Sequence, residues 1–92
     1  MISEKPTASI TPTSTTLLVG AKLTLTCQVS GDPQPTISWS KDGSPMSVTT
    51  KTFTKQNLQL SDEGSYSCNV TNRHGDATAT SNVTVDGKAI FG

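Results

Sequence analysis

Long apolar runs and any excess of charge are both missing from this sequence of 92 residues. Seven basic and seven acidic side chains give a formal net charge of zero, so we expect no basic patch for nucleic acid or an acidic membrane surface. No apolar run approaches the roughly 18 residues of a membrane helix. The N-terminal MISEKPTASI lacks the apolar core of a signal peptide. Nucleic-acid binding and membrane insertion by this segment are therefore not expected.

Histidine and cysteine are too scarce for metal or catalytic chemistry. Two distant cysteines fit neither a CxxC redox motif nor a zinc site, which needs more ligands. A Ser-His-Asp site needs a base within hydrogen-bond reach of the nucleophile. His74 falls in a predicted hairpin tip, whereas Ser65 and Ser67 face solvent, and a metal site at His74 and Asp76 has no further support. We predict no enzymatic activity, no metal and no cofactor.

Serine and threonine are abundant, at 28 of the 92 residues, and this bias favours strands and turns over helices. The length predicts one domain over residues 1–86, with its core at about 6–85. Residues 87–92 are expected to be a linker toward a following domain or an appended tail. Met1 is interpreted as an artificial start, and the chain as one module of a longer protein.

Four segments alternate with period 2, which is the pattern of half-buried strands. Cys27 and Leu25 share the inward face of the first segment, Trp39 lies inward in the second, and Cys68 lies inward in the third. The segments are residues 22–30 (KLTLTCQVS), 36–41 (TISWSK), 64–72 (GSYSCNVTN) and 76–85 (DATATSNVTV).

Turn chemistry separates these segments. Residues 30–35 (SGDPQP) and 41–45 (KDGSP) carry Gly, Asp and Pro in turn positions, and residues 72–75 (NRHG) predict a hairpin. Residues 46–60 are the least regular part, with Phe53 and Leu58 as the best core candidates. Short strands separated by turns indicate an all-β sandwich or barrel. Inward cysteines on different strands, with an inward tryptophan between them, favour the sandwich.

These residues resemble the immunoglobulin superfamily, and most closely its I-set or a short C2-like variant. The resemblance covers about Pro6 to Val85. It is carried by Cys27, by GDPQPTISWSKDG with Trp39, by DEGSYSC with Asp62, Gly64, Tyr66 and Cys68, and by NRHG.

The resemblance implies a Greek-key sandwich of two antiparallel sheets joined by a Cys27–Cys68 disulfide. That bridge would close a loop of about 40 residues, worth about 4 kcal/mol in the chain-entropy model. Trp39 would pack against the bridge, and the Tyr66 hydroxyl would bond back to the backbone at a tyrosine corner. Gly64 would let the chain turn there without a Cβ clash.

Two further expectations follow from the resemblance. Asp62 would pair with a basic residue near the start of strand D or E, and Lys51 is the available candidate. The cysteines are 41 positions apart, which is short for an I-set domain. We therefore expect an abbreviated C′–D region, with strand D missing or fused into strand E.

Two Asn-x-Thr sequons start at Asn69 and Asn82, and both asparagines face outward by alternation. About one sequon is expected by chance in a chain with this many hydroxyl residues. The sequence therefore does not decide whether these asparagines carry glycans. Both would lie on a sheet face of serine and threonine without aromatic hot-spot residues. We predict that this face is not the main adhesive surface.

Loop ends are the predicted contact points for a protein partner, homophilic or heterophilic, or for neighbouring domains. They comprise Asp32 to Thr36, including Gln34, together with Arg73 and His74. A pure spacer without a ligand is the alternative.

The leading functional hypothesis is an extracellular module of a multidomain adhesion or receptor protein, because paired cysteines persist as a bridge in oxidising compartments. The rival is an intracellular, cytoplasmic or sarcomeric structural module of a giant muscle or cytoskeletal protein. A third possibility is a surface decoration module of a phage or bacterial protein.

Overall fold

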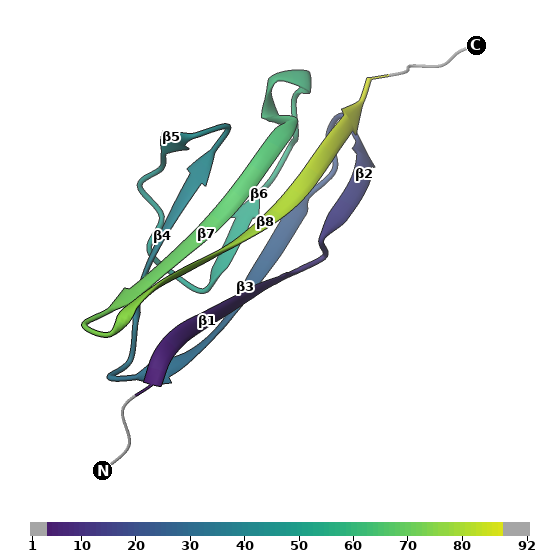
Figure 1. Cartoon of the computed structure of the whole chain (residues 1–92). Helices are drawn as coiled ribbons and strands as arrows, with labels where there is room; N and C mark the ends of the chain where they lie inside the picture. Colours follow the sequence, from purple (N-terminus) through teal and green to yellow (C-terminus); the bar gives the residue numbers. More distant parts are fainter. Residues whose placement is uncertain (1–3, 88–92) are drawn as a thin grey trace.

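The computed structural model describes residues 4–87, which form eight strands and one short 3-10 helix in two layers (Figure 1). Residues 1–3 and 88–92, which include Met1 and most of the predicted tail, lie outside the described part. The elements are β1 (Glu4–Thr11), β2 (Ser14–Leu18), β3 (Leu23–Asp32), β4 (Thr36–Lys41), β5 (Ser44–Pro45), β6 (Thr52–Lys55), η1 (Leu60–Asp62), β7 (Gly64–Asn72) and β8 (Gly75–Asp86).

The strands form one sheet in the order β1-β3-β6 and a second in the order β2-β8-β7-β4-β5. All neighbouring strands are antiparallel except β2, which runs parallel to β8. The predicted two-sheet sandwich is therefore confirmed. Within residues 4–87, the segment between the two-residue β5 and β6 holds no strand, so the expected shortening of this region is confirmed as well.

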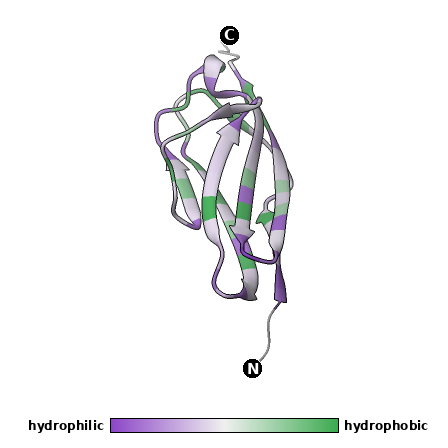
Figure 2. Cartoon of the chain, turned by 60° about the vertical axis from the view of Figure 1, so that its left-hand side comes forward, coloured by the Kyte–Doolittle hydropathy of each residue, from purple (hydrophilic) through white to green (hydrophobic). Residues whose placement is uncertain are grey.

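The core lies between the sheets and is built by strand alternation. In β7, Tyr66, Cys68 and Val70 are buried while the residues between them are partly exposed. Phe53 and Leu58 join this core, as predicted, although no alternation connects them. Figure 2 shows the result as apolar positions spaced along strands that otherwise carry hydrophilic or neutral residues. The buried apolar side chains are Ile10, Leu23, Leu25, Cys27, Trp39, Phe53, Leu58, Tyr66, Cys68, Val70, Val83 and Val85.

The N-terminal segment changes from one sheet to the other around Pro12, which sequence periodicity did not predict. Before this point β1 pairs with β3, and after it β2 pairs with β8. Proline has no backbone N–H to offer to a ladder, so it suits the gap between two strands. Ser81 is fully buried, and its hydroxyl donates to the Pro12 carbonyl at 2.7 Å. This bond ties the crossing point to β8.

The prediction of a turn beginning at Ser30 is wrong for its first three residues. β3 continues to Asp32, which pairs with Glu4 of β1. Gly31 permits this pairing, because a Cβ there would lie 3.0 Å from the Pro6 Cα and 3.1 Å from the Pro35 Cγ. The strand is extended by a partner far away in the sequence, which local turn chemistry does not reveal.

The second predicted turn is confirmed at Asp42 and Gly43, which connect β4 to β5. Their φ angles are 50° and 86°, and positive φ at both central residues is what a two-residue hairpin loop of the Asp-Gly type requires. The third prediction, the hairpin at residues 72–75, is also confirmed, because Asn72 pairs directly with Gly75.

Replacing Gly31 by alanine tests the close approach of β1. Its φ of 147° and the short contact to the Pro6 backbone should together lower the free energy of unfolding by about 1–3 kcal/mol, measured by chemical denaturation. Gly43→Asn is the control, because nothing lies within 4 Å of a Cβ at Gly43 and asparagine tolerates positive φ. Equal stability of the Gly31→Ala variant and the parent protein would contradict this account of the site.

Candidate interaction surfaces and the residues that build them

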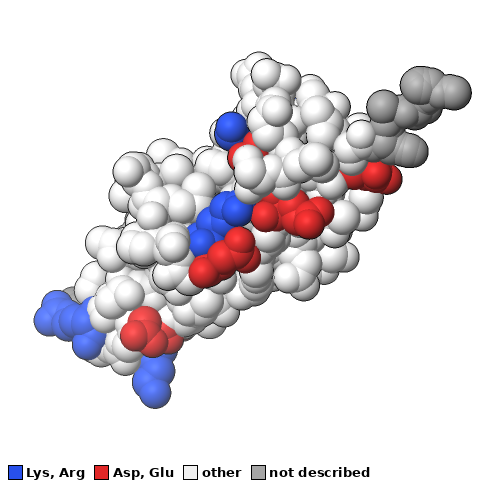
Figure 3. Space-filling model, turned by 90° about the horizontal axis from the view of Figure 1, so that it is seen from above, with Lys and Arg blue, Asp and Glu red and all other residues white. Residues whose placement is uncertain are grey.

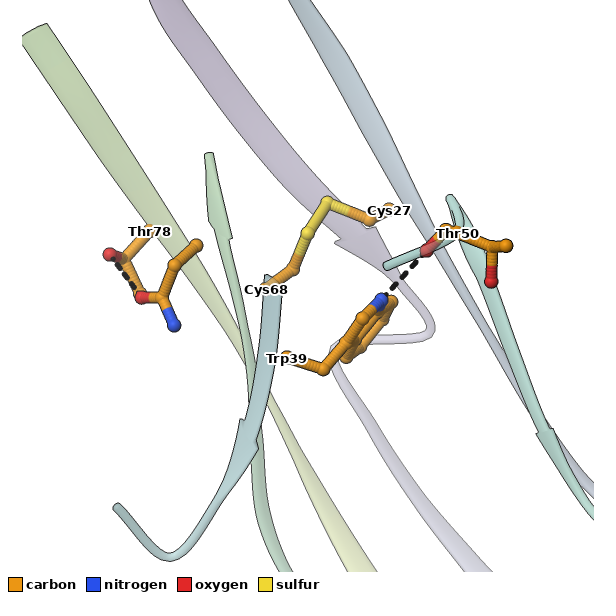
Figure 4. The surroundings of a disulfide bond; sticks show 6 residues. Cys27, Trp39, Thr50, Cys68 and Thr78 are labelled. Carbon is orange, nitrogen blue, oxygen red and sulfur yellow. Dashed lines mark hydrogen bonds between the residues drawn. A yellow bond between two sulfur atoms is a disulfide. The ribbon is translucent and has the colours of Figure 1, made fainter. Parts of the chain in front are cut away.

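A disulfide and a tryptophan occupy the centre of the molecule (Figure 4). Cys27 of β3 and Cys68 of β7 are bonded across the two sheets and are fully buried, so the predicted bridge is confirmed. Trp39 lies beside it, and its indole N–H donates to the Thr50 carbonyl at 2.8 Å. That bond satisfies the polar atom of a side chain that is only 1% exposed. It also anchors the strandless segment that leads into β6.

Three aromatic rings extend this centre toward the corner between η1 and β7. The centroids of Trp39 and Phe53 are 5.9 Å apart, and those of Phe53 and Tyr66 are 5.5 Å apart. The Tyr66 hydroxyl donates to the Asp62 carbonyl at 2.5 Å. The corner predicted for Tyr66 is therefore present, and it joins residues that lie four positions apart in the sequence.

The expected partner of Asp62 was wrong. The Asp62 carboxylate lies 3.6 Å from the Lys55 ammonium and accepts the Gln59 backbone N–H at 2.7 Å. Lys51 precedes β6, and its carbonyl accepts the Cys27 N–H in the middle of the sheet. Because β6 runs toward η1, the lysine at its far end, and not the one before its start, reaches Asp62.

The surroundings of Tyr66 disfavour its ionisation. Burial, followed by the nearby carboxylates of Asp62 and Asp42, raises the pKa of Tyr66 to about 12. The Lys41 ammonium lies 5.9 Å from the ring centroid and also donates to the Ser61 carbonyl. The phenol is therefore a neutral donor at every physiological pH.

Gly64 is needed at the corner because Asp42 approaches it closely. A Cβ on Gly64 would lie 2.5 Å from one Asp42 carboxylate oxygen. That carboxylate accepts the Ser65 backbone N–H at 2.9 Å, while the Asp42 N–H donates to the Ser65 carbonyl. The Ser65 N–H in turn holds the pKa of Asp42 below its usual value. The β4–β5 turn is thus fastened to the start of β7.

The outer face of the five-stranded sheet is lined by hydroxyl groups. Ser67 and Thr80 face each other with their oxygens 3.2 Å apart, and the Thr78 hydroxyl donates to Asn69 Oδ1 at 2.9 Å. These are cross-strand pairs in the register of β7 and β8. The face also presents Ser38, Ser40, Ser65, Thr71, Thr84 and Asn82.

The two sequon asparagines differ in their surroundings. Asn82 is exposed on β8 opposite Ser14, whereas Asn69 is half-buried in β7. The Thr78 bond engages Oδ1 of Asn69 and not Nδ2, the atom to which an N-glycan attaches. Both sites therefore stay available as predicted acceptors.

The predicted contact residues gather at one end of the sandwich, which we call the N-terminal pole: residues 4–6, 31–35 and 72–75 (Figure 1). The Asn72 amide donates to the carbonyls of Glu4 and Pro33, and its oxygen accepts the His74 N–H. One side chain thus joins three segments. Sequence reasoning missed Asn72, whose only signal was its place in the NRHG turn.

The four predicted contact residues are not equally available. Asp32, Gln34 and Arg73 are exposed, whereas His74 is half-buried. The His74 Nε2 is buried, and within residues 4–87 it has no hydrogen-bond partner. Beside Gln34 lies a depression of about 420 Å³, lined by Gln34, Pro35, Thr36, Ile37, Thr49 and Lys51.

On the face that Figure 3 shows, charged side chains of both signs are interspersed. Within the described residues, no group of three or more His, Cys, Asp or Glu side chains is arranged to hold a metal ion. The same residues include no helix with the length and apolar character needed to cross a membrane.

The pKa of Tyr66 generates a testable pH dependence. An unfolded tyrosine ionises near pH 10, whereas the folded protein keeps the Tyr66 proton until about pH 12. The stability that this proton contributes should therefore be complete below pH 10 and lost as the pH rises toward 12. Because the chain has one tyrosine, tyrosinate absorbance reports this group alone.

Tyr66→Phe provides the comparison for this titration. It should lower the free energy of unfolding by about 1 kcal/mol at neutral pH, through loss of the bond to Asp62, and flatten the alkaline stability curve relative to the parent protein. An ionisation midpoint near 10 in the folded protein would contradict the described burial.

Comparison with known proteins agrees with this geometry. The family model of the immunoglobulin I-set domain matches residues 6–85. Protein sax-3 of Caenorhabditis elegans is 36% identical over 97 residues, covering 98% of this chain and 8% of sax-3. The Titin homolog of the same organism is 36% identical over 83 residues, covering 80% of this chain and, to the nearest per cent, 0% of that relative.

A solved structure matches closely as well. The crystal structure of the N-terminal eight Ig domains of Down Syndrome Cell Adhesion Molecule superposes with a TM-score of 0.90 and 28% identity. It covers 96% of this chain and 13% of that chain. This chain spans only a small part of each of these proteins. By its family match, its sequence relatives and its disulfide-bonded sandwich, the chain belongs to the immunoglobulin I-set domain family.

Proposed function

We propose that this chain is a non-catalytic immunoglobulin module of a larger multidomain extracellular adhesion or receptor protein. It acts there in protein–protein recognition or as a spacer. The observation that carries the proposal is the Cys27–Cys68 disulfide, which is fully buried and joins both sheets. Such a bridge forms and persists in oxidising compartments and is rare in the cytosol. The adhesion molecule named among the structural neighbours supports the same role.

The two sequons add weaker support for an extracellular setting, since about one sequon is expected by chance. Asn82 is exposed, and the hydrogen bond of Asn69 uses its oxygen and not the nitrogen that a glycan needs. Glycans on either residue would stand on the outer face of the five-stranded sheet. Since that face also lacks the Trp, Tyr and Arg side chains that dominate interface energies, we assign recognition to other parts of the module.

The N-terminal pole is the proposed contact surface. Asp32, Gln34 and Arg73 are exposed there, on segments that the Asn72 bonds hold together. A contact surface held in place before binding loses less conformational freedom on association. The depression beside Gln34 adds a concave element, with Ile37 and Pro35 as apolar lining.

The rival proposal is an intracellular structural module, and similarity to the Titin homolog favours it. In that setting Cys27 and Cys68 would remain reduced thiols, and neither sequon would carry sugar. The two proposals therefore predict different covalent states of the same residues.

The covalent state of the native protein decides between them. Protein isolated from its natural source and alkylated in denaturant at lysis, so that the buried positions are accessible, should show Cys27 and Cys68 unmodified before reduction and alkylated only after it. Glycosidase treatment should release sugar from Asn82, Asn69 or both, and Asn82→Gln with Asn69→Gln should abolish that mass loss. If the cysteines are alkylated before reduction and no glycan is found, the extracellular proposal is wrong.

The recognition surface is tested in the full-length protein by bead aggregation for homophilic binding and by capture of its partner for heterophilic binding. Arg73→Ala combined with Gln34→Ala should weaken binding about tenfold or more, which is the size of a modest interface contribution. Ser67→Arg is the control on the sheet face and should leave binding unchanged. An interface that buries Ser38 or Ser67 would contradict this assignment.

A further inference from the structure

Three large aliphatic side chains are strongly exposed in the described part of the chain. Leu18 is 60% exposed, Val19 42% and Leu60 61%. Leu18 and Val19 end β2 and begin the turn into β3, whereas Leu60 opens η1. Single exposed apolar residues are ordinary, but a group of them in one place marks an interaction surface.

All three side chains surround the point where the chain leaves the sandwich. Leu18 is the register partner of Asp86, and the Val19 N–H donates to the Asp86 carbonyl at 3.1 Å. The Leu60 side chain lies against Gly87, since a Cβ there would be 2.8 Å from a Leu60 methyl carbon. We call this group (Leu18, Val19 and Leu60) the exit patch. It lies at the opposite end from the N-terminal pole (Figure 1).

The backbone is held firmly up to the exit patch. The Val85 N–H donates to the Glu63 carboxylate at 2.9 Å, and the Gly20 N–H donates to the Leu58 carbonyl at 2.8 Å. The first bond ties β8 to the residue that follows η1, and the second ties the β2–β3 turn to the segment before η1. The direction of the chain at Asp86 is therefore set by contacts and not left to a free strand end.

The size of the exit patch decides what covers it. Three side chains fall far short of the roughly 800 Å² per partner that a stable interface between separate proteins needs. A partner joined covalently needs much less, because a short linker makes its local concentration very high. A second free copy of this chain is therefore a poor occupant, and a domain tethered at residue 87 is a good one.

The geometry points to the exit patch as the seat of the domain that directly follows this one in the same protein, holding the two domains in a fixed orientation. Leu18 and Leu60 contact apolar side chains of that domain. The inference rests on the part of the proposed function that makes this chain a module of a longer protein. It applies equally to an extracellular and an intracellular parent.

The test compares this chain with the two-domain fragment of its parent that begins with it. Nitrogen-15 relaxation measures how each domain tumbles. With the patch occupied, both domains should share one rotational correlation time, about twofold longer than that of the single chain, whereas unconnected domains move independently. Leu18→Thr with Leu60→Thr should make the two times diverge. Gln34→Thr, at the other pole, is the matched control and should leave them equal.

Each outcome of this experiment supports or overturns the inference about the exit patch. Independent tumbling in the unmodified two-domain fragment, or equal correlation times in the Leu18→Thr/Leu60→Thr variant, overturns the inference. A dimer of the single chain in sedimentation, lost on these two substitutions, also overturns the inference. The exit patch would then bind a second copy of this chain. A finding of reduced cysteines would refute the extracellular proposal and leave this result untouched.

Discussion

The packing of Trp39 against the Cys27–Cys68 bridge is the constraint on which the rest of the structure depends. The bridge ties β3 of one sheet to β7 of the other, and the indole fills the space beside it. Because the indole N–H bonds to Thr50, the same side chain also positions the strandless link into β6. Phe53 and Tyr66 continue the aromatic layer to the corner, so one contiguous core reaches from the disulfide to the beginning of β7.

The two ends of the sandwich are built by different means. Polar atoms organise the N-terminal pole, where the Asn72 amide joins β1, the loop after β3 and the β7–β8 turn. At the exit end, backbone bonds and the Glu63 carboxylate hold the chain, and aliphatic side chains remain exposed around it. A polar, ordered end suits a specific contact with water at its rim. An apolar end next to the chain exit suits a tethered neighbour.

Hydroxyl side chains give the broad sheet face a different character from either end. Its cross-strand pairs satisfy each other's hydrogen bonds, as Thr78 and Asn69 do. The face therefore offers few apolar groups whose burial in an interface would be favourable. A face of this kind stabilises the strands through pairing and stays soluble. We propose that contacts form at the two ends and that the face between them stays solvated. This assignment follows from the distribution of side chains.

Sequence by itself determined the parts of this protein that depend on local period. Alternation predicted the sandwich, because inward positions recur at every second residue of a strand. The resemblance carried by Cys27, Trp39, Tyr66 and Cys68 implied its bridge and its corner. Only the tertiary structure decided which distant residues meet. It gave Asp62 the partner Lys55 in place of Lys51, extended β3 to Asp32 against β1, moved the chain between sheets at Pro12, and gathered Leu18, Val19 and Leu60 at the exit. These outcomes depend on strand pairing between segments far apart in the chain, and the pattern within any one segment carries no information about its partner.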